Sequence, residues 1–121
     1  MKQESSSDLE IYNKLCNHAK DMAGIDIRYV RRRRHAEIIR IRACIMVIMI
    51  RYYRISTVSI GRLMQRDHAT VVHHHGNHSS RYQSEEEYYN LYTLLCGFVE
   101  RVAPVEFELD EVNTYIKAIA P

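Results

Sequence analysis

The segment from residue 36 to residue 53 places the strongest constraint on the fold. Its residues 44 to 50 are apolar on nearly every side of a helix, which is typical of a central helix enclosed by others. Their isoleucine and valine side chains would also suit a strand, but the length of the segment and the arginines that flank it favour a helix. The sequence therefore predicts an all-α bundle around a helix from Ala36 to Tyr53.

Capping and stop signals place further helices on both sides of this segment. Ser7 and Glu10 have the spacing of a capping box, and apolar residues recur at helical intervals from Leu9, so a first helix is expected to run to about Met22 and to end at Gly24. A second capping box, Ser84-x-x-Glu87, is expected to open a helix that Pro104 ends. A last short helix is expected over residues 110 to 120.

Two shorter helices are expected between these elements. Ser56 can cap a helix over residues 57 to 64, and Asp67 can cap another from residue 68 to about residue 77. The tight turn between them makes the pair a helix-turn-helix candidate. The residues expected in the core of this unit are Ile60, Val71 and Val72, with close helix packing at Gly61.

Length, cysteine use and hydropathy limit the class of protein. A chain of 121 residues suits one domain with one hydrophobic core. No leader pattern stands at the N-terminus, and the longest apolar run, residues 43 to 50, is far shorter than the roughly 20 residues a bilayer requires. Cys16, Cys44 and Cys96 are odd in number, widely spaced and set among apolar residues, which favours reduced core thiols. We therefore expect a soluble, cytoplasmic protein.

The net charge of +2 conceals a strong asymmetry along the chain. Residues 28 to 66 hold eleven arginines, no lysine and one acid, Glu37, and so carry +10. Residues 83 to 121 hold eight acids against two basic residues and so carry −6. The planar guanidinium group suits bidentate recognition of phosphate and guanine better than an ammonium group does. The basic segment therefore favours a nucleic-acid partner.

The most specific pattern lies in residues 56 to 73. Ser56 is followed by Ile60-Gly61 and then by Arg-Asp-His-Ala-Thr-Val-Val-His over residues 66 to 73, while upstream the arginines 31 to 34 lead into Ile39-Arg40-Ile41-Arg42. This ordered combination resembles domain IV, the C-terminal helix-turn-helix domain of the bacterial replication initiator DnaA, over about residues 11 to 95. The resemblance implies a Trp-repressor-like all-α fold that binds double-stranded DNA at short DnaA-box-like sites.

The expected helices, the charge pattern and the extent of the resemblance divide the chain into three parts. Residues 1–7 are expected to be disordered, residues 8–96 to form the DnaA-like DNA-binding domain, and residues 97–121 to form an acidic helical extension, to which a replication or transcription protein can bind. No Gly-x4-Gly-Lys-Ser/Thr sequence is present, so no ATPase activity is expected. The sequence supports no nucleophile–base pair or metal centre beyond residue types, so no other enzymatic activity and no cofactor is expected. Phage and mobile-element chains that carry this domain alone fit such a sequence, with a role in replication initiation, its regulation, or transcription.

The start of the second short helix holds the expected base-reading residues. Asp67 can accept a hydrogen bond from a cytosine amino group, and His68 can contact a thymine methyl group or a purine acceptor. The resemblance places Ala69 where a threonine usually contacts a thymine methyl group, and Arg34 where an arginine reaches into the minor groove. Phosphate contacts are expected from the following residues: Arg31, Arg32, Arg33, Arg40, Arg42, Arg66, Thr70 and His73.

Three alternatives remain open at this level. Asp67 can be an N-cap and nothing more. The chain can be a dimeric repressor of the Trp-repressor type, paired through its C-terminal helix on a two-fold site. The histidines 73 to 75 and His78 have spacings that suit a metal site or a metal enzyme, yet no cysteine or carboxylate follows at zinc-like spacing, so no metal is expected.

Overall fold

The computed structural model describes residues 6–29 and 35–102. These residues form six helices and no strand, so the predicted all-α bundle is confirmed over this part of the chain. The N-terminal residues 1–5, the arginine run at residues 31–34 and the helix expected over residues 110–120 lie outside the described residues. In chain order the helices are α1 (Ser6–Ala23), α2 (Ala36–Tyr53), α3 (Thr57–Met64), α4 (His68–Gly76), α5 (His78–Ser84) and α6 (Glu86–Val102).

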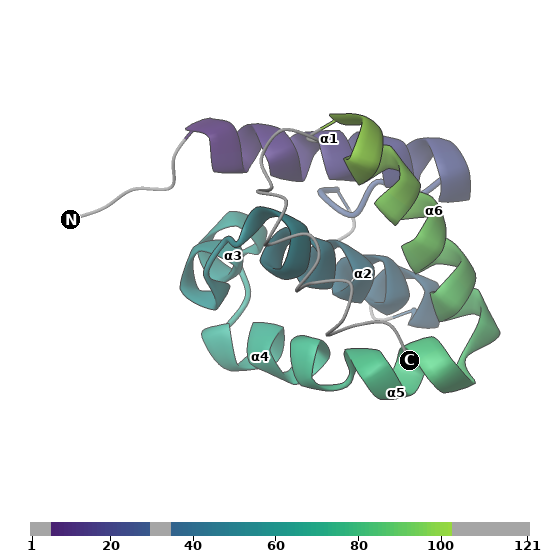
Figure 1. Cartoon of the computed structure of the whole chain (residues 1–121). Helices are drawn as coiled ribbons and strands as arrows, with labels where there is room; N and C mark the ends of the chain where they lie inside the picture. Colours follow the sequence, from purple (N-terminus) through teal and green to yellow (C-terminus); the bar gives the residue numbers. More distant parts are fainter. Residues whose placement is uncertain (1–5, 30–34, 103–121) are drawn as a thin grey trace, which may run out of the picture.

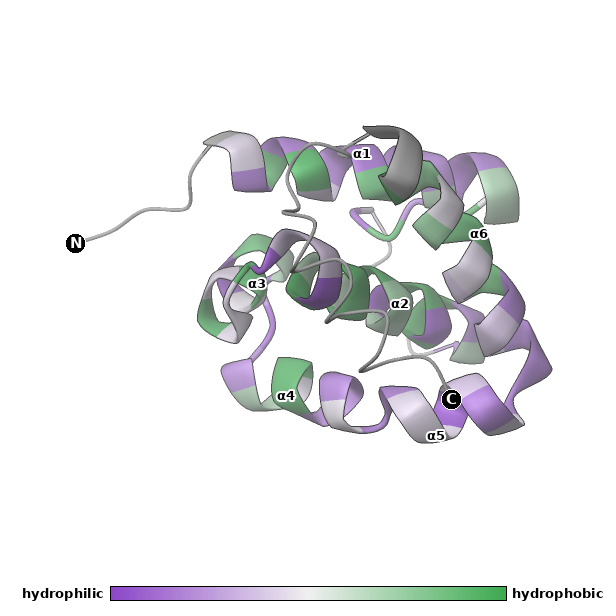
Figure 2. Ribbon diagram, viewed as in Figure 1, coloured by the Kyte–Doolittle hydropathy of each residue, from purple (hydrophilic) through white to green (hydrophobic). Residues whose placement is uncertain are grey.

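The central helix α2 has the predicted bounds and the predicted surroundings. Every side chain from residue 41 to residue 49 is buried. Helices α1, α3, α4 and α6 all pack against α2, which lies between α1 on one side and α4 on the other in Figure 1. In Figure 2, α2 is hydrophobic along most of its length. Burial of this apolar surface is the main stabilising contribution to the bundle.

The three cysteines belong to the core. Cys16 on α1, Cys44 on α2 and Cys96 on α6 are free and buried, as predicted. Burial disfavours the thiolate, which raises the pKa of Cys16 to about 12 and shifts that of Cys44 in the same direction. These thiols therefore act as small apolar side chains and are poor nucleophiles.

The ends of α1 follow the sequence closely. The helix begins at Ser6, one residue before the predicted cap Ser7, so Ser6 and Ser7 are not part of a disordered start. At its C-terminal end, Gly24 has a φ of 76°, a left-handed conformation that glycine adopts without a steric cost. Residues 25 to 29 form a short turn rather than a helix.

Two predictions near the C-terminal half of the domain are wrong. Local sequence patterns predict no helix over the residues of α5, and they predict that Ser84 caps the next helix. Ser84 is instead the last residue of α5, and its hydroxyl donates a hydrogen bond of 2.7 Å to the Ser80 carbonyl oxygen. Glu85 precedes α6, and its carbonyl accepts a hydrogen bond from the Tyr89 amide at 2.9 Å.

No helix within the described ranges is long and apolar enough to cross a membrane.

Candidate nucleic-acid interface

Helices α3 and α4 follow one another with a short connection, at the place where the sequence offers a helix-turn-helix candidate. The Ser56 side chain accepts a hydrogen bond of 3.1 Å from the Ser59 amide, which caps α3 as expected. Gln65 ends α3 in a left-handed conformation with a φ of 55°. The Arg66 amide then donates to the Gly61 carbonyl oxygen at 2.8 Å, and α4 begins after Asp67. Residues 65 to 67 therefore form a tight turn.

Gly61 allows the turn to lie close against α3. A Cβ atom at this position would lie 2.7 Å from the Arg66 carbonyl oxygen, which is closer than real Cβ contacts. The same atom would lie 3.6 Å from the His68 amide nitrogen, at the start of α4. The prediction that Gly61 serves close packing is therefore confirmed.

One face of α4 is anchored in the core and the other is exposed. Val71 is fully buried, whereas His68, Ala69, Val72 and His73 are exposed. The prediction that Val72 belongs to the core is wrong, because its side chain is 46% exposed. Successive residues point about 100° apart around a helix, so the burial of Val71 turns its neighbour outward.

Asp67 occupies the N-cap position of α4 without making a side-chain cap. Its backbone is extended, with φ −61° and ψ 144°, and its side chain makes no cap hydrogen bond. The first turn of α4 is closed by its backbone carbonyl, which accepts from the amides of Thr70 and Val71 at 3.0 and 3.3 Å. A capping side chain would accept a hydrogen bond from an amide in the first turn of the helix. The Asp67 carboxylate is exposed and accepts no such hydrogen bond.

The remaining residues of the candidate site lie on α3, on the turn and on α4. Thr70 and Arg66 are half-buried, and Arg62 on α3 is exposed. One guanidinium nitrogen of Arg66 donates to the Gln65 carbonyl oxygen at 3.1 Å, so the end of this side chain lies against the turn. Asp67, His68, Ala69, Thr70, His73 and Arg66 are thus brought together by two turns of helix and one tight turn.

The structure does not place Arg40 and Arg42 on a common surface. The Arg40 guanidinium forms an ion pair of 2.9 Å with Glu87 on α6 and is 18% exposed. Arg42 is 7% exposed and lines a cavity of about 110 Å³ beside Gln65. Residues two apart on a helix point about 200° apart, and the two guanidinium groups accordingly lie in different surroundings.

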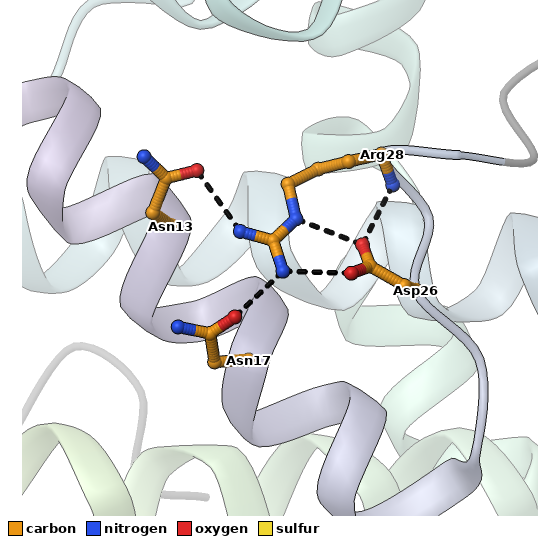
Figure 3. A network of polar contacts seen from close by, with 4 residues as sticks. All are labelled: Asn13, Asn17, Asp26 and Arg28. Atoms are coloured by element: carbon orange, nitrogen blue, oxygen red, sulfur yellow. Dashed lines mark hydrogen bonds and ion pairs between the residues drawn. The ribbon is translucent and has the colours of Figure 1, made fainter.

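Arg28 is part of a polar network that joins the loop after α1 to α1 itself (Figure 3). Its guanidinium donates to the Asn13 and Asn17 side-chain oxygens at 3.1 and 2.6 Å, and to both Asp26 carboxylate oxygens at 2.8 and 2.7 Å. The hydrogen bond from Arg28 is the main cause that holds the pKa of Asp26 below its usual value. The charge of Arg28, counted in the basic segment, is therefore compensated by an acid just outside it.

The histidine run divides between the surface and the core. His73 is exposed, and one of its ring nitrogens lies 3.1 Å from the Asn77 side-chain nitrogen. His78 is 4% exposed, and its Nδ1 atom shares a hydrogen bond of 2.8 Å with the Tyr88 hydroxyl. Burial, with the nearby charges of Arg51 and His75, lowers the pKa of His78 to about 4. Within the described part of the chain, no three His, Cys, Asp or Glu side chains are placed to hold a metal ion.

Two exposed residues close to the candidate site, Val72 and Arg62, were not assigned to it from the sequence. Val72 was assigned to the core, although its spacing of four residues from His68 places both on one helix face. Arg62 precedes Arg66 by four residues, a spacing that brings both close to the turn. Arg31, Arg32, Arg33 and Arg34 lie outside the described residues.

Comparisons with protein-family models, with curated proteins and with solved structures found no match to this chain.

Proposed function

We propose that this chain is a sequence-specific double-stranded-DNA-binding protein that reads the major groove with α4. It acts as a stand-alone relative of DnaA domain IV on short DnaA-box-like sites, in replication initiation, its regulation, or transcription, without hydrolysing ATP. The single observation that carries the proposal is the exposed position of Asp67 and His68 at the start of α4, directly after a tight helix-turn-helix turn.

The anchoring of α4 supports this role. Val71 is buried against the bundle, and the Gly61 contact leaves no room to shift the turn. Base recognition requires side chains held in a fixed register on a rigid element. The exposed face of α4 is held in this way, while Asp67 and His68 extend beyond the core.

Each side chain has a role in the proposed complex. The Asp67 carboxylate accepts a hydrogen bond from a cytosine amino group, and His68 contacts a thymine methyl group or a purine acceptor in the next base pair. Thr70 and Arg66 bind phosphate and fix the register of α4 in the groove. Arg62, exposed on α3, adds a further positive charge close to the turn in the chain.

Selection from a randomised duplex library, followed by footprinting, tests the proposal. We expect one enriched sequence, protected over a short site, with an affinity at least 1,000-fold above that for random duplex. A symmetric, two-fold footprint would favour the dimeric repressor instead. Failure to enrich any duplex would reject sequence-specific DNA binding.

Alanine substitutions separate base reading from capping. Asp67→Ala and His68→Ala should each reduce discrimination between the selected and random duplexes by about 1–3 kcal/mol, because each removes a base contact. Thr70→Ala should weaken binding to both duplexes more evenly, because a phosphate contact carries no sequence information. The measurement is the ratio of the two Kd values for each variant.

Asp21→Ala is the matched control, since Asp21 is an exposed acid on α1. It should leave both affinities unchanged. An Asp67→Ala variant that lowered the melting temperature but kept the wild-type ratio would identify Asp67 as a cap alone.

A further inference from the structure

The exposed face of α4 carries an apolar strip between polar ends. Ala69 and Val72 are both exposed and lie three residues apart, so they are neighbours on one face of the helix. His68 stands before this strip and His73 follows it. An exposed valine is ordinary on a protein surface, but this one lies on the face that is proposed to enter the groove.

The major groove offers one apolar group to such a strip. Among the base edges, only thymine presents a methyl group there, and all other groups are hydrogen-bond donors or acceptors. Val72 lies four residues after His68, about 6 Å further along the helix axis, so its side chain would face the groove beyond the position of His68. The Cα–Cβ bond leans toward the helix N-terminus, so the Val72 methyl groups extend back toward Ala69.

We propose that Val72 packs against the methyl group of a thymine that lies beyond the base pair read by His68, on the side toward the C-terminus of α4. This inference rests on the proposed function and extends the reading surface of α4 by one helical turn. Val72 is then a specificity-determining residue, because a cytosine or a purine at that position presents no methyl group to its side chain.

A protein partner fits this strip less well. Stable protein–protein interfaces bury at least about 1,000 Å² around a hydrophobic centre. On α4 the apolar strip consists of one valine and one alanine, with histidines next to both. Its size matches one base edge and not a protein surface.

Replacement of single thymines by deoxyuridine tests the inference, because this exchange removes only the methyl group. In the duplex enriched by selection, we expect that replacing one particular thymine weakens binding of the wild-type protein by about 3- to 10-fold. Val72→Ala should weaken binding to the unmodified duplex by a similar factor and should no longer respond to that replacement. Val72→Thr, which keeps one methyl group, should retain part of the response.

The variants should fold, because position 72 is exposed and alanine favours a helix more than valine does. Leu94→Ala is the control, since Leu94 is an exposed apolar residue on α6 with an exposed fraction of 60%. It should respond to deoxyuridine as the wild type does.

Two results would overturn the inference while the proposed function stands. In the first, the wild-type protein binds its selected duplex with an affinity that no deoxyuridine replacement changes. In the second, the Val72→Ala variant responds to the replacement as strongly as the wild type does. A wild-type protein that enriches no duplex would reject the proposed function and this inference together.

Discussion

Gly61 shows how one residue determines the geometry of the turn between α3 and α4. Its missing side chain lets the Arg66 carbonyl oxygen lie 2.7 Å from the place where a Cβ atom would stand. The atoms opposite are backbone, so a larger residue could be accommodated only by moving the turn or α3. Gly97 on α6 has no atom within 4 Å of the same position and offers a direct comparison.

We expect Gly61→Ala to lower the free energy of unfolding by about 1–3 kcal/mol, because it forces a steric overlap into a packed turn. Gly97→Ala should raise it by about 0.5–1 kcal/mol, because alanine loses less backbone entropy in a helix. Urea denaturation of the two variants measures both effects. Equal stabilisation by both substitutions would show that the turn tolerates a side chain at position 61.

At the scale of elements, α5 is held to α6 by an aromatic cluster around His78. The His78 ring lies 4.4 Å from the Tyr92 ring and 5.5 Å from the Tyr82 ring, measured between centroids, and its Nδ1 atom is hydrogen-bonded to Tyr88. Arg81 of α5 also lies over the Tyr88 ring, 4.6 Å from its centroid. These contacts hold α5 against α6, and no local sequence pattern predicts them.

This cluster makes stability depend on pH. The pKa of His78 is about 4 in the folded state and about 6.5 in an unfolded chain, so the unfolded state binds more protons between these values. Its contribution is therefore complete above pH 6.5 and is lost as the pH falls toward 4. We expect the free energy of unfolding to fall by about 2 kcal/mol between pH 7 and pH 5. The lowered pKa values of His74 and His75 act in the same direction.

Urea denaturation at both pH values measures this change. His78→Phe should flatten the dependence, even though it leaves the Tyr88 hydroxyl without its partner and lowers stability overall. An unchanged slope in His78→Phe would assign the effect to other groups.

The loop after α1 is a second contact that depends on one side chain. The Arg28 guanidinium contacts three side chains at once, which requires its planar, forked geometry. We expect Arg28→Lys to lower the free energy of unfolding by about 1–3 kcal/mol, because a single ammonium group leaves part of the network unpaired. The reverse exchange at the exposed Lys14, Lys14→Arg, should change it by less than about 0.5 kcal/mol. A thermal melt of both variants distinguishes the outcomes.

For the whole molecule, the charge that faces a ligand differs from the charge counted along the chain. Arg28 is paired with Asp26, Arg40 with Glu87, and Arg42 is buried. The arginine-rich segment therefore divides into side chains that hold helices together and side chains, such as Arg62, that remain at the surface.

Salt dependence of DNA affinity measures this division. Each phosphate contact contributes about 0.9 to the slope of log affinity against log salt. We expect Arg66→Gln to reduce the slope by about 0.9, whereas Arg40→Gln should leave it unchanged, because Arg40 is engaged with Glu87. An equal reduction in both variants would mean that Arg40 leaves α6 and binds phosphate. A wild-type affinity that ignores salt would remove the charge argument for a DNA partner.

The sequence by itself determined where most helices begin and end. The N-cap at Ser56, the left-handed Gly24 and the helical periodicity of residues 36 to 53 are local features, and local interactions set helix boundaries. The glycine at position 61 was likewise readable as a packing residue.

The tertiary structure alone decided which way each side chain faces. Val71 and Val72 are chemically identical neighbours, yet only Val71 meets the core, because α4 contacts the bundle along one narrow face. Arg40 and Arg42 share one motif, but Arg40 reaches α6 and Arg42 lines a pocket beside Gln65. The polar segment of α5 is held in place by tyrosines of α6 through contacts between residues that lie ten or more positions apart in the chain. Such contacts form only when the helices pack, so no local pattern specifies them.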